Sequence, residues 1–273
     1  MLLIFLLLAA GAIAGLLSGF FGVGGGLILV PAVLFSLHFT GLPSESHMHI
    51  ALATSLTTIL INSLFSARKH NKNKNIRWDL VTAMSVGVGG GAIIGSLSTS
   101  FLDTQWLTLV FCLFTIYTAI ELIKKSLRPG NYKAIPNMDG FGSYNRPRLI
   151  FGGIGIGWIS SLVGIGGGSL TVPMLAKHAE MKQAVASSTL VAIPLALFSM
   201  LTYMLTGWQQ TSDYALTTGY IYWPAVIALT ATGTICSHLG ASWADKIKEQ
   251  YLKTGFSCLL LIIVVAILFR TIS

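Results

Sequence analysis

The chain has 273 residues, of which 53% are hydrophobic and only 10% are charged, and its formal net charge is +8. A soluble domain carries about 25% charged residues, so this composition excludes an ordinary soluble protein and indicates a chain surrounded mainly by lipid. The basic residues stand on short connections between apolar runs and form no nucleic-acid-binding motif, which favours membrane topology over a nucleic-acid partner as the cause of the charge.

Apolar runs recur along the whole chain. In the first half they cover 2–20, 27–39, 50–66, 79–100 and 106–123, and in the second half 149–163, 169–176, 184–206, 219–238 and 251–270. A helix needs about 20 residues to cross the hydrocarbon core, so the second run of each half is short for a full span. It could instead form a hairpin with the first run that enters the membrane and returns. The sequence predicts an all-α integral membrane protein with roughly eight to ten helical segments.

The two halves repeat one another. The run Gly22-Val23-Gly24-Gly25-Gly26 recurs as Gly164-Ile165-Gly166-Gly167-Gly168, an offset of 142 residues. The same offset relates four further pairs: Gly15 and Gly157, Ser18 and Ser160, Gly91 and Gly233, and Asp103 and Asp245. After an extra loop in the first half, residues 49–55 pair with residues 182–188. We expect a first membrane repeat at 1–128, a basic cytoplasmic linker at 129–148 and a second repeat at 149–273. An odd number of crossings would make the two repeats inverted.

The basic residues predict the orientation of the chain. If the N-terminus lies outside, the cytoplasmic connections hold every Lys and Arg except Arg270, and the exterior connections 40–48, 101–105 and 207–218 hold none. This is the asymmetry that the positive-inside rule describes. We therefore expect a protein of a bacterial inner membrane with both termini outside the cytoplasm.

The glycine runs are the first candidate binding site. Glycine weakens a helix by about 1 kcal/mol relative to alanine, so four glycines within five residues predict a broken helix. Inside a membrane such a break is tolerated where it is buried in protein or lines a cavity, and the helix that restarts presents its N–H groups to an anion. The alternative is that the glycines only allow close helix packing. The candidate residues are Gly22, Gly24, Gly25, Gly26, Gly164, Gly166, Gly167 and Gly168.

Hydroxyl side chains are the second candidate. Thr54 and Ser55 in the first half match Ser187 and Ser188 in the second. Hydroxyls can donate hydrogen bonds to an oxyanion without the cost of burying a cation. The alternatives are that they bond to carbonyls one turn earlier in their own helices or join neighbouring helices.

The remaining polar residues predict no cofactor and no metal. His38, His47 and His49 lie near one exterior loop, but no carboxylate or cysteine completes a ligand set. His49 and Lys182 occupy equivalent repeat positions and could be gate residues or interfacial anchors. The acidic residues of the apolar runs stand near the segment ends, so the sequence identifies no coupling ion.

Several of these motifs together resemble the TauE/SafE sulfite exporter family over almost the full length. They are the paired glycine runs with the following Val-Pro, the segments 49–55 and 182–188, and Arg77-Trp78-Asp79-Leu80. The resemblance implies a transporter of sulfur-containing anions such as sulfite, thiosulfate or organosulfonates. Ala53 and Ala186 stand where the family often has glycine, and Ser188-Thr189 replaces the usual Ser-Leu, which bears on the substrate more than on the fold.

The expected function is a secondary transporter, specifically an exporter, that works by alternating access. An anion channel and a membrane scaffold subunit without transport are the alternatives. No HExxH motif or nucleophile elbow occurs, so we do not expect an enzyme. The expected partners are a small anion and the lipid bilayer, and the sequence leaves open whether the chain forms a homodimer.

Overall fold

The computed structural model describes residues 2–21, 25–37, 39–72, 76–127, 146–211, 214, 216–244 and 249–272. The first half contains α1 (Leu2–Phe21), α2 (Gly26–Leu37), a 3₁₀ turn η1 (Ser44–Ser46), α3 (His47–Lys72), α4 (Trp78–Thr99) and α5 (Thr104–Leu127). The second half contains α6 (Arg146–Val163), α7 (Gly168–Leu175), α8 (Met181–Thr206), α9 (Trp208–Thr211), β1 (Thr217–Thr218), β2 (Ile221–Tyr222), α10 (Trp223–Ala244) and α11 (Glu249–Ile272). Each of the ten predicted apolar segments corresponds to a helix. Of the predicted linker, only the residues that begin α6 are described.

The structure corrects the prediction between α8 and α10. The apolar run predicted at 219–238 begins its helix only at Trp223, because the residues before it form an antiparallel hairpin of β1 and β2. Gly219 adopts a φ of +56° in the turn, which glycine allows without the steric cost of a Cβ. A Cβ at Gly219 would overlap the backbone of Met204, so the hairpin lies directly against α8. The short helix α9 was also not predicted.

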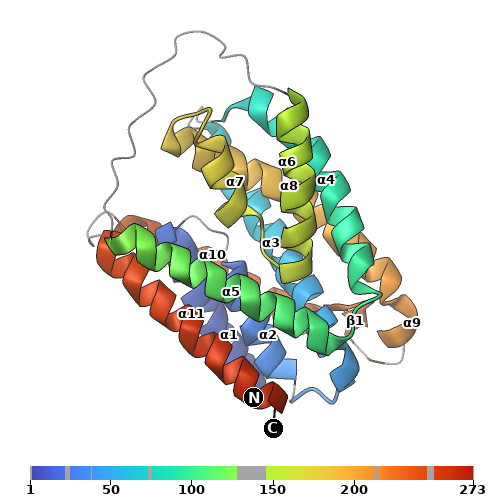
Figure 1. Cartoon of the computed structure of the whole chain (residues 1–273). Helices are drawn as coiled ribbons and strands as arrows, with labels where there is room; N and C mark the ends of the chain where they lie inside the picture. Colours follow the sequence, from blue (N-terminus) through green and yellow to red (C-terminus); the bar gives the residue numbers. More distant parts are fainter. Residues whose placement is uncertain are drawn as a thin grey trace.

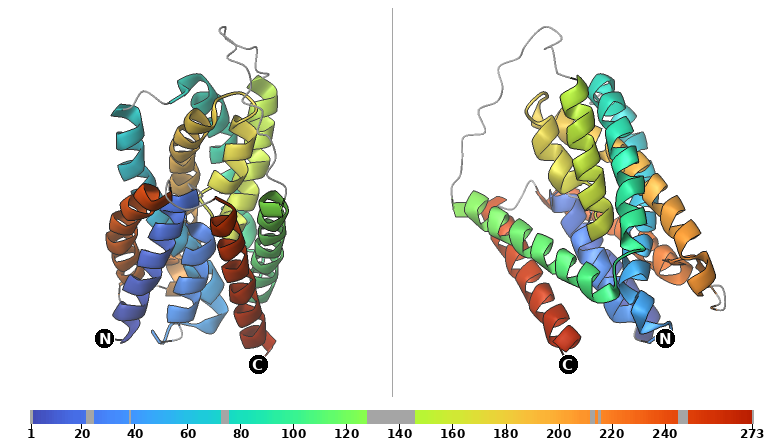
Figure 2. Two further views of the ribbon diagram at one scale, coloured as in Figure 1. Left: turned by 90° about the vertical axis from the view of Figure 1, so that its left-hand side faces the viewer. Right: turned by 45° about the vertical axis from the view of Figure 1, so that its right-hand side comes forward.

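Two helices are too short to cross a membrane alone. At about 1.5 Å per residue, α2 with 12 residues and α7 with 8 residues fall well below the roughly 30 Å of a hydrocarbon core. Each follows a longer helix and returns beside it, so that α1–α2 and α6–α7 are hairpins. The α1–α2 hairpin opens at the end of the molecule where both termini lie, and the α6–α7 hairpin opens at the opposite end (Figures 1 and 2).

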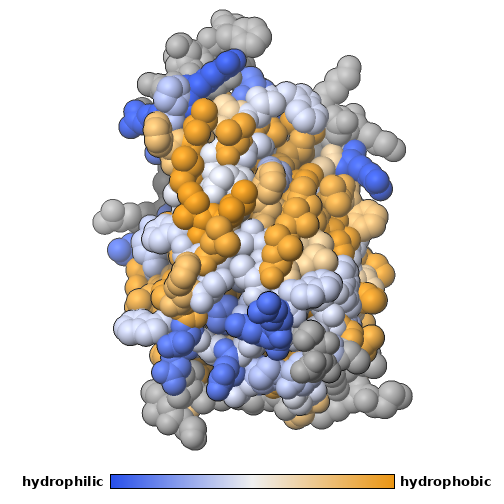
Figure 3. Space-filling model, turned by 90° about the vertical axis from the view of Figure 1, so that its right-hand side faces the viewer, coloured by the Kyte–Doolittle hydropathy of each residue, from blue (hydrophilic) through white to orange (hydrophobic). Residues whose placement is uncertain are grey.

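The long helices and the surface fit a membrane environment. Four stretches of the described residues are long and apolar enough to cross one by length and composition: Ser44–Arg68, Trp78–Thr99, Thr104–Lys124 and Gln183–Thr206. On the face in Figure 3, hydrophobic residues cover a broad area between hydrophilic patches nearer the two ends. Trp78, Trp106 and Trp208 are each more than half exposed at the first turn of a helix, as is typical of a membrane–water interface. The chain is therefore an α-helical membrane protein.

Helices of the two halves pack against each other rather than forming separate bundles. The most extensive contacts join α1 to α10, α4 to α6, α3 to α8, α4 to α8 and α5 to α11, and each pair takes one helix from each half. Gly87, Gly91 and Gly95 form a small-residue stripe on α4, and a Cβ on any of them would overlap the backbone of α6 or the Ser161 hydroxyl. Small residues at this spacing let two helix backbones approach closely. The packing role of glycine is thus clear on α4.

We expect Gly91→Ala to lower the thermal unfolding midpoint, because the added methyl must push α4 away from Ile154 of α6. Overpacking of this kind costs about 1–3 kcal/mol. Gly90→Ala is the matched control on the same helix, since a Cβ there meets nothing within 4 Å. The control should unfold at the same or a higher temperature, because alanine favours helix over glycine. Equal midpoints for the two variants in detergent would contradict the close contact between α4 and α6.

Candidate functional site

The second glycine run separates α6 from α7 and is shaped by two left-handed residues. Gly164 and Gly167 have φ values of +72° and +70°, which glycine adopts readily. Gly167 is the N-cap of α7, and its carbonyl oxygen accepts hydrogen bonds from the N–H groups of Leu170 at 2.9 Å and Thr171 at 2.7 Å. The prediction of a broken helix at this run is confirmed.

The first glycine run ends in the same way. Gly25 has a φ of +65°, and its carbonyl oxygen accepts hydrogen bonds from the N–H groups of Ile28 at 3.0 Å and Leu29 at 3.1 Å. Gly25 therefore caps α2 as Gly167 caps α7, at the offset that the sequence repeat gives. Gly22 and Gly24 lie outside the described residues.

The two helix breaks, one before α2 at Gly25 and one between α6 and α7 at residues 164–167, contact each other. A Cβ built on Gly26 would lie 2.8 Å from both the carbonyl oxygen of Gly164 and the Cα atom of Ile165, closer than real Cβ contacts. Gly164 is covered in turn by Val30 of α2 and Leu52 of α3, and Gly166 lies against Ile59 of α3. Gly26, Gly164 and Gly168 are all buried. The absence of side chains on the glycines is what lets the backbone of α2 reach the second break.

The two predicted hydroxyls of the first half form hydrogen bonds with the backbone of the second half. Ser55 Oγ donates a hydrogen bond of 2.9 Å to the carbonyl oxygen of Gly164, so it contacts the second break directly. Thr54 Oγ1 accepts a hydrogen bond of 3.1 Å from the N–H of Tyr222, the residue before α10. Both side chains are fully buried. Of the predicted hydroxyls, Ser55 is the one whose described bond reaches a glycine break.

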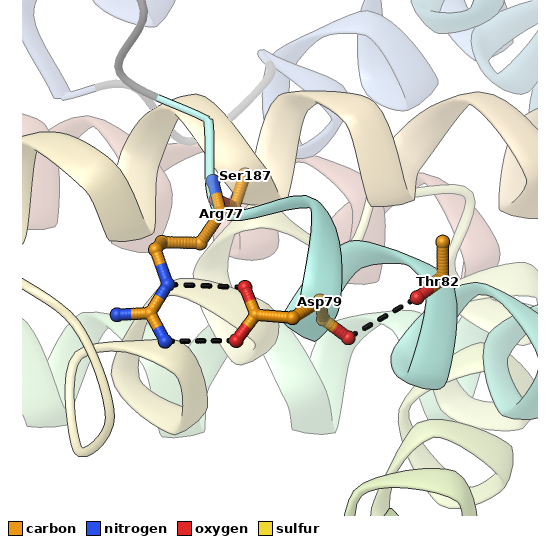
Figure 4. Close-up of polar contacts among 4 residues, drawn as sticks. All are labelled: Arg77, Asp79, Thr82 and Ser187. Carbon is orange, nitrogen blue, oxygen red and sulfur yellow. Dashed lines mark hydrogen bonds and ion pairs between the residues drawn. The ribbon is translucent and has the colours of Figure 1, made fainter. Parts of the chain in front are cut away.

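In the second half, Ser187 Oγ accepts a hydrogen bond of 3.1 Å from the N–H of Arg77, the residue before α4 (Figure 4). It therefore holds the start of α4 in the other half, as Thr54 holds the start of α10. Ser188 differs from its repeat partner Ser55, because its Oγ donates to the carbonyl oxygen of Val185 in its own helix. The structure therefore contains both alternatives for the hydroxyls, local bonds and bonds between helices.

The Arg77-Trp78-Asp79-Leu80 motif forms a bidentate ion pair at the start of α4. Arg77 Nε donates to Asp79 Oδ1 at 3.0 Å, and Nη2 donates to Oδ2 at 2.8 Å (Figure 4). The carboxylate of Asp79 also lies in the first helical turn, where the helix dipole favours a negative charge. This motif acts on the same connection that Ser187 caps.

His49 is a buried link between helices rather than an exposed interfacial anchor. Its Nε2 atom lies 3.0 Å from the carbonyl oxygen of Thr99 at the end of α4, and its ring stacks on Tyr220 of the hairpin with a centroid distance of 5.0 Å. The side chain of its repeat partner Lys182 lies outside the described residues. His49 thus helps to close the exterior end of the molecule in the predicted orientation.

Two buried hydroxyls beside the second break were not among the predicted site residues. The Oγ atoms of Ser160 on α6 and Ser169 on α7 are buried and have no hydrogen-bond partner among the described residues. Ser160 Oγ lies 3.6 Å from the point where a Cβ on Gly167 would stand. The recurrence of Ser18 as Ser160 was the sequence signal that could have drawn attention to it.

Long stretches of the helices that form and contact the breaks carry no acidic or basic residue. The stretches 25–37, 50–66, 149–175 and 183–206 contain no Asp, Glu, Lys, Arg or His in the sequence. A ligand bound between these stretches would be held by neutral groups, namely backbone N–H and carbonyl groups and hydroxyls. The N–H groups and the dipole at the start of a helix favour an anion.

Comparison with known proteins gives the class of protein to which this site belongs. The family described as Sulfite exporter TauE/SafE matches residues 7–267. The chain belongs to the TauE/SafE family. It is 34% identical to a Haemophilus influenzae protein named "Probable membrane transporter protein", over 96% of this chain and 97% of that protein. A Methanocaldococcus jannaschii protein with the same description, MJ0441, is 32% identical over 95% of this chain and 93% of its own length. No solved structure matches the chain. The resemblance inferred from the motifs is confirmed, and this TauE/SafE protein is a membrane transporter by family.

Proposed function

We propose that this TauE/SafE protein is a secondary transporter that exports a small sulfur-containing anion, such as sulfite, thiosulfate or an organosulfonate. The family description supports sulfite export as the kind of activity. The observation that carries the proposal is the contact of Gly26 with Gly164 and Ile165, because it brings two helix breaks together in a region without charged residues. Helix N-termini at such a break can bind an anion through backbone N–H groups.

The proposed transporter consists of two inverted repeats. The matching caps at Gly25 and Gly167 support this, as do the two hairpins that open at opposite ends of the molecule (Figures 1 and 2). Inverted repeats with discontinuous helices that meet at their interface are a common design of secondary transporters. In this proposal α1–α2 and α6–α7 are re-entrant hairpins that meet near the middle of the membrane.

The proposed orientation places both termini outside the cytoplasm of a bacterial inner membrane. The α3–α4 and α7–α8 connections and the start of α6 lie at the end opposite the termini (Figure 1). The basic residues of these regions whose side chains the structure describes are Arg68, Arg77, Arg146, Arg148 and Lys177. The connections at the other end contain no Lys or Arg, which supports a cytoplasmic assignment for the basic end.

Alternating access in this proposal requires the two halves to separate and rejoin. Gly26, Gly164 and Ser55 are buried, so an anion reaches the breaks only if their contact opens. The hydrogen bonds Ser55–Gly164, Thr54–Tyr222 and Ser187–Arg77 each join one half to the other. We assign these bonds to a closed state, and the glycines with Thr54, Ser55, Ser187 and Ser188 to the region through which the anion passes.

Counterflow in proteoliposomes tests this function. We expect sulfite flux to saturate with concentration, and an inside load of unlabelled sulfite to accelerate uptake of labelled sulfite, since a carrier returns faster when loaded. Chloride at the same concentration should not replace the load. Flux that stays linear with concentration and shows no counterflow would identify a channel, and no flux with any of the three proposed anions would leave the scaffold alternative.

A further inference from the structure

We propose that the second glycine break alone forms the anion subsite, with Ser160 and Ser169 as its hydroxyl donors, and that the ligand headgroup is an oxyanion with a single negative charge. This inference rests on the proposed transport function and narrows its site and substrate class. Neither hydroxyl is among the residues assigned above to the passage of the anion.

Ser160 is the first of these. Its side chain is fully buried, and its Oγ atom has no hydrogen-bond partner among the described residues. A buried hydroxyl without a partner is unfavourable, which makes it a group that a ligand can satisfy. Its Oγ atom lies beside Gly167, the N-cap of α7, and 3.6 Å from the point where a Cβ on Gly167 would stand. Leu195 Cδ1 lies 3.1 Å from the same point, so this leucine side chain must move to admit a ligand.

Ser169 adds a second hydroxyl at the same helix end. Its Oγ atom is buried and likewise has no partner in the described part of the chain. Gly168 and Ser169 are the first two residues of α7, and no helical carbonyl stands four residues before them to accept their N–H groups. The carbonyl of Gly167 already accepts from the next two N–H groups, of Leu170 and Thr171. Two hydroxyls and two N–H groups are therefore available as donors at one break.

The first break differs from the second in one of these donors. At the repeat offset, Leu27 stands where the second half has Ser169, and Leu29 stands where it has Thr171. Ser18 matches Ser160, but its side chain lies outside the described residues. Leu27 is 1% exposed and belongs to the hydrophobic core. The first break therefore supplies an apolar wall, with Gly26 packed on the second break, and the site is not symmetric.

The stretches 149–175 and 183–206, which include α7 and its neighbours in the second half, contain no charged residue, and this favours a ligand of low charge. Stripping water from a doubly charged anion costs far more than from a singly charged one. Four neutral donors therefore favour a sulfonate or another singly charged oxyanion over sulfate. A sulfonate group also presents three acceptor oxygens for these donors.

The test measures the affinity of the purified full-length protein for methanesulfonate by thermal stabilisation, with sulfate at equal ionic strength as the doubly charged comparison. A ligand that binds the native state raises the unfolding midpoint with concentration. We expect methanesulfonate to stabilise the wild type and sulfate not to do so. Ser160→Ala and Ser169→Ala should each weaken methanesulfonate binding about tenfold or more.

The same variants separate a binding role from a structural one. Without ligand, both should unfold at the wild-type temperature or higher, because each removes a buried hydroxyl that has no partner. Thr230→Val is the matched control, since Thr230 Oγ1 is also buried without a described partner but lies on α10, and it should bind methanesulfonate like the wild type. Wild-type affinity in both serine variants, or equal stabilisation by sulfate, would overturn the inference. If sulfite counterflow persists in that case, the transport function stands and only the subsite is wrong.

Discussion

Gly26→Ala is expected to reduce sulfite transport about tenfold or more and to lower the free energy of unfolding by about 1–3 kcal/mol. The added Cβ would stand 2.8 Å from the carbonyl oxygen of Gly164 and from Ile165 Cα. Both are backbone atoms that cannot rotate away, so the two breaks must separate. Proteoliposome uptake and thermal unfolding in detergent measure the two effects.

Gly155→Ala is the control for this variant. Gly155 lies on α6 close to the second break in sequence, and a Cβ there meets nothing within 4 Å. It should transport and unfold like the wild type. Wild-type transport by Gly26→Ala would show that the close contact of the breaks is not required for the cycle.

Ser55→Ala is expected to lower the free energy of unfolding by about 1–3 kcal/mol, because it leaves the buried carbonyl oxygen of Gly164 without the described donor. Ser188→Ala is the repeat-related comparison for stability. Its Oγ donates to Val185, a carbonyl that also accepts from Thr189 Oγ1, so its loss should cost less than about 1 kcal/mol. Denaturation of both variants in detergent gives the difference, and equal losses would contradict the bond between Ser55 and the second break.

The helices and their breaks could be predicted because they depend on local sequence. Apolar runs of sufficient length must form helices in lipid, and a run of four glycines in five residues cannot continue one. The hairpin before α10 was missed because Ile221 and Tyr222 are as apolar as the helix that follows. Its cause is the packing of Gly219 against Met204, which no local pattern reveals.

The partners of the candidate site could not be predicted, because they come from distant parts of the chain. Ser55 and Gly164 are 109 residues apart, and Thr54 and Tyr222 are 168 apart. The repeat indicated that Ser55 and Ser188 are equivalent in position, but the structure gives them different bonds. Sequence symmetry identifies matching positions, and only the packing of the two halves decides which hydroxyls are bonded and which, like Ser160, remain without a described partner.

We expect an oxyanion to bind where the two glycine breaks meet. Selenite has the pyramidal shape of sulfite and contains an atom heavy enough to locate by anomalous X-ray scattering, so crystals grown with selenite test the claim directly. A selenium peak should appear within hydrogen-bond reach of Gly168 and Ser169 at the start of α7, and it should be lost in crystals grown with excess sulfite. A displaceable peak elsewhere in the protein, with none at the breaks, would contradict it.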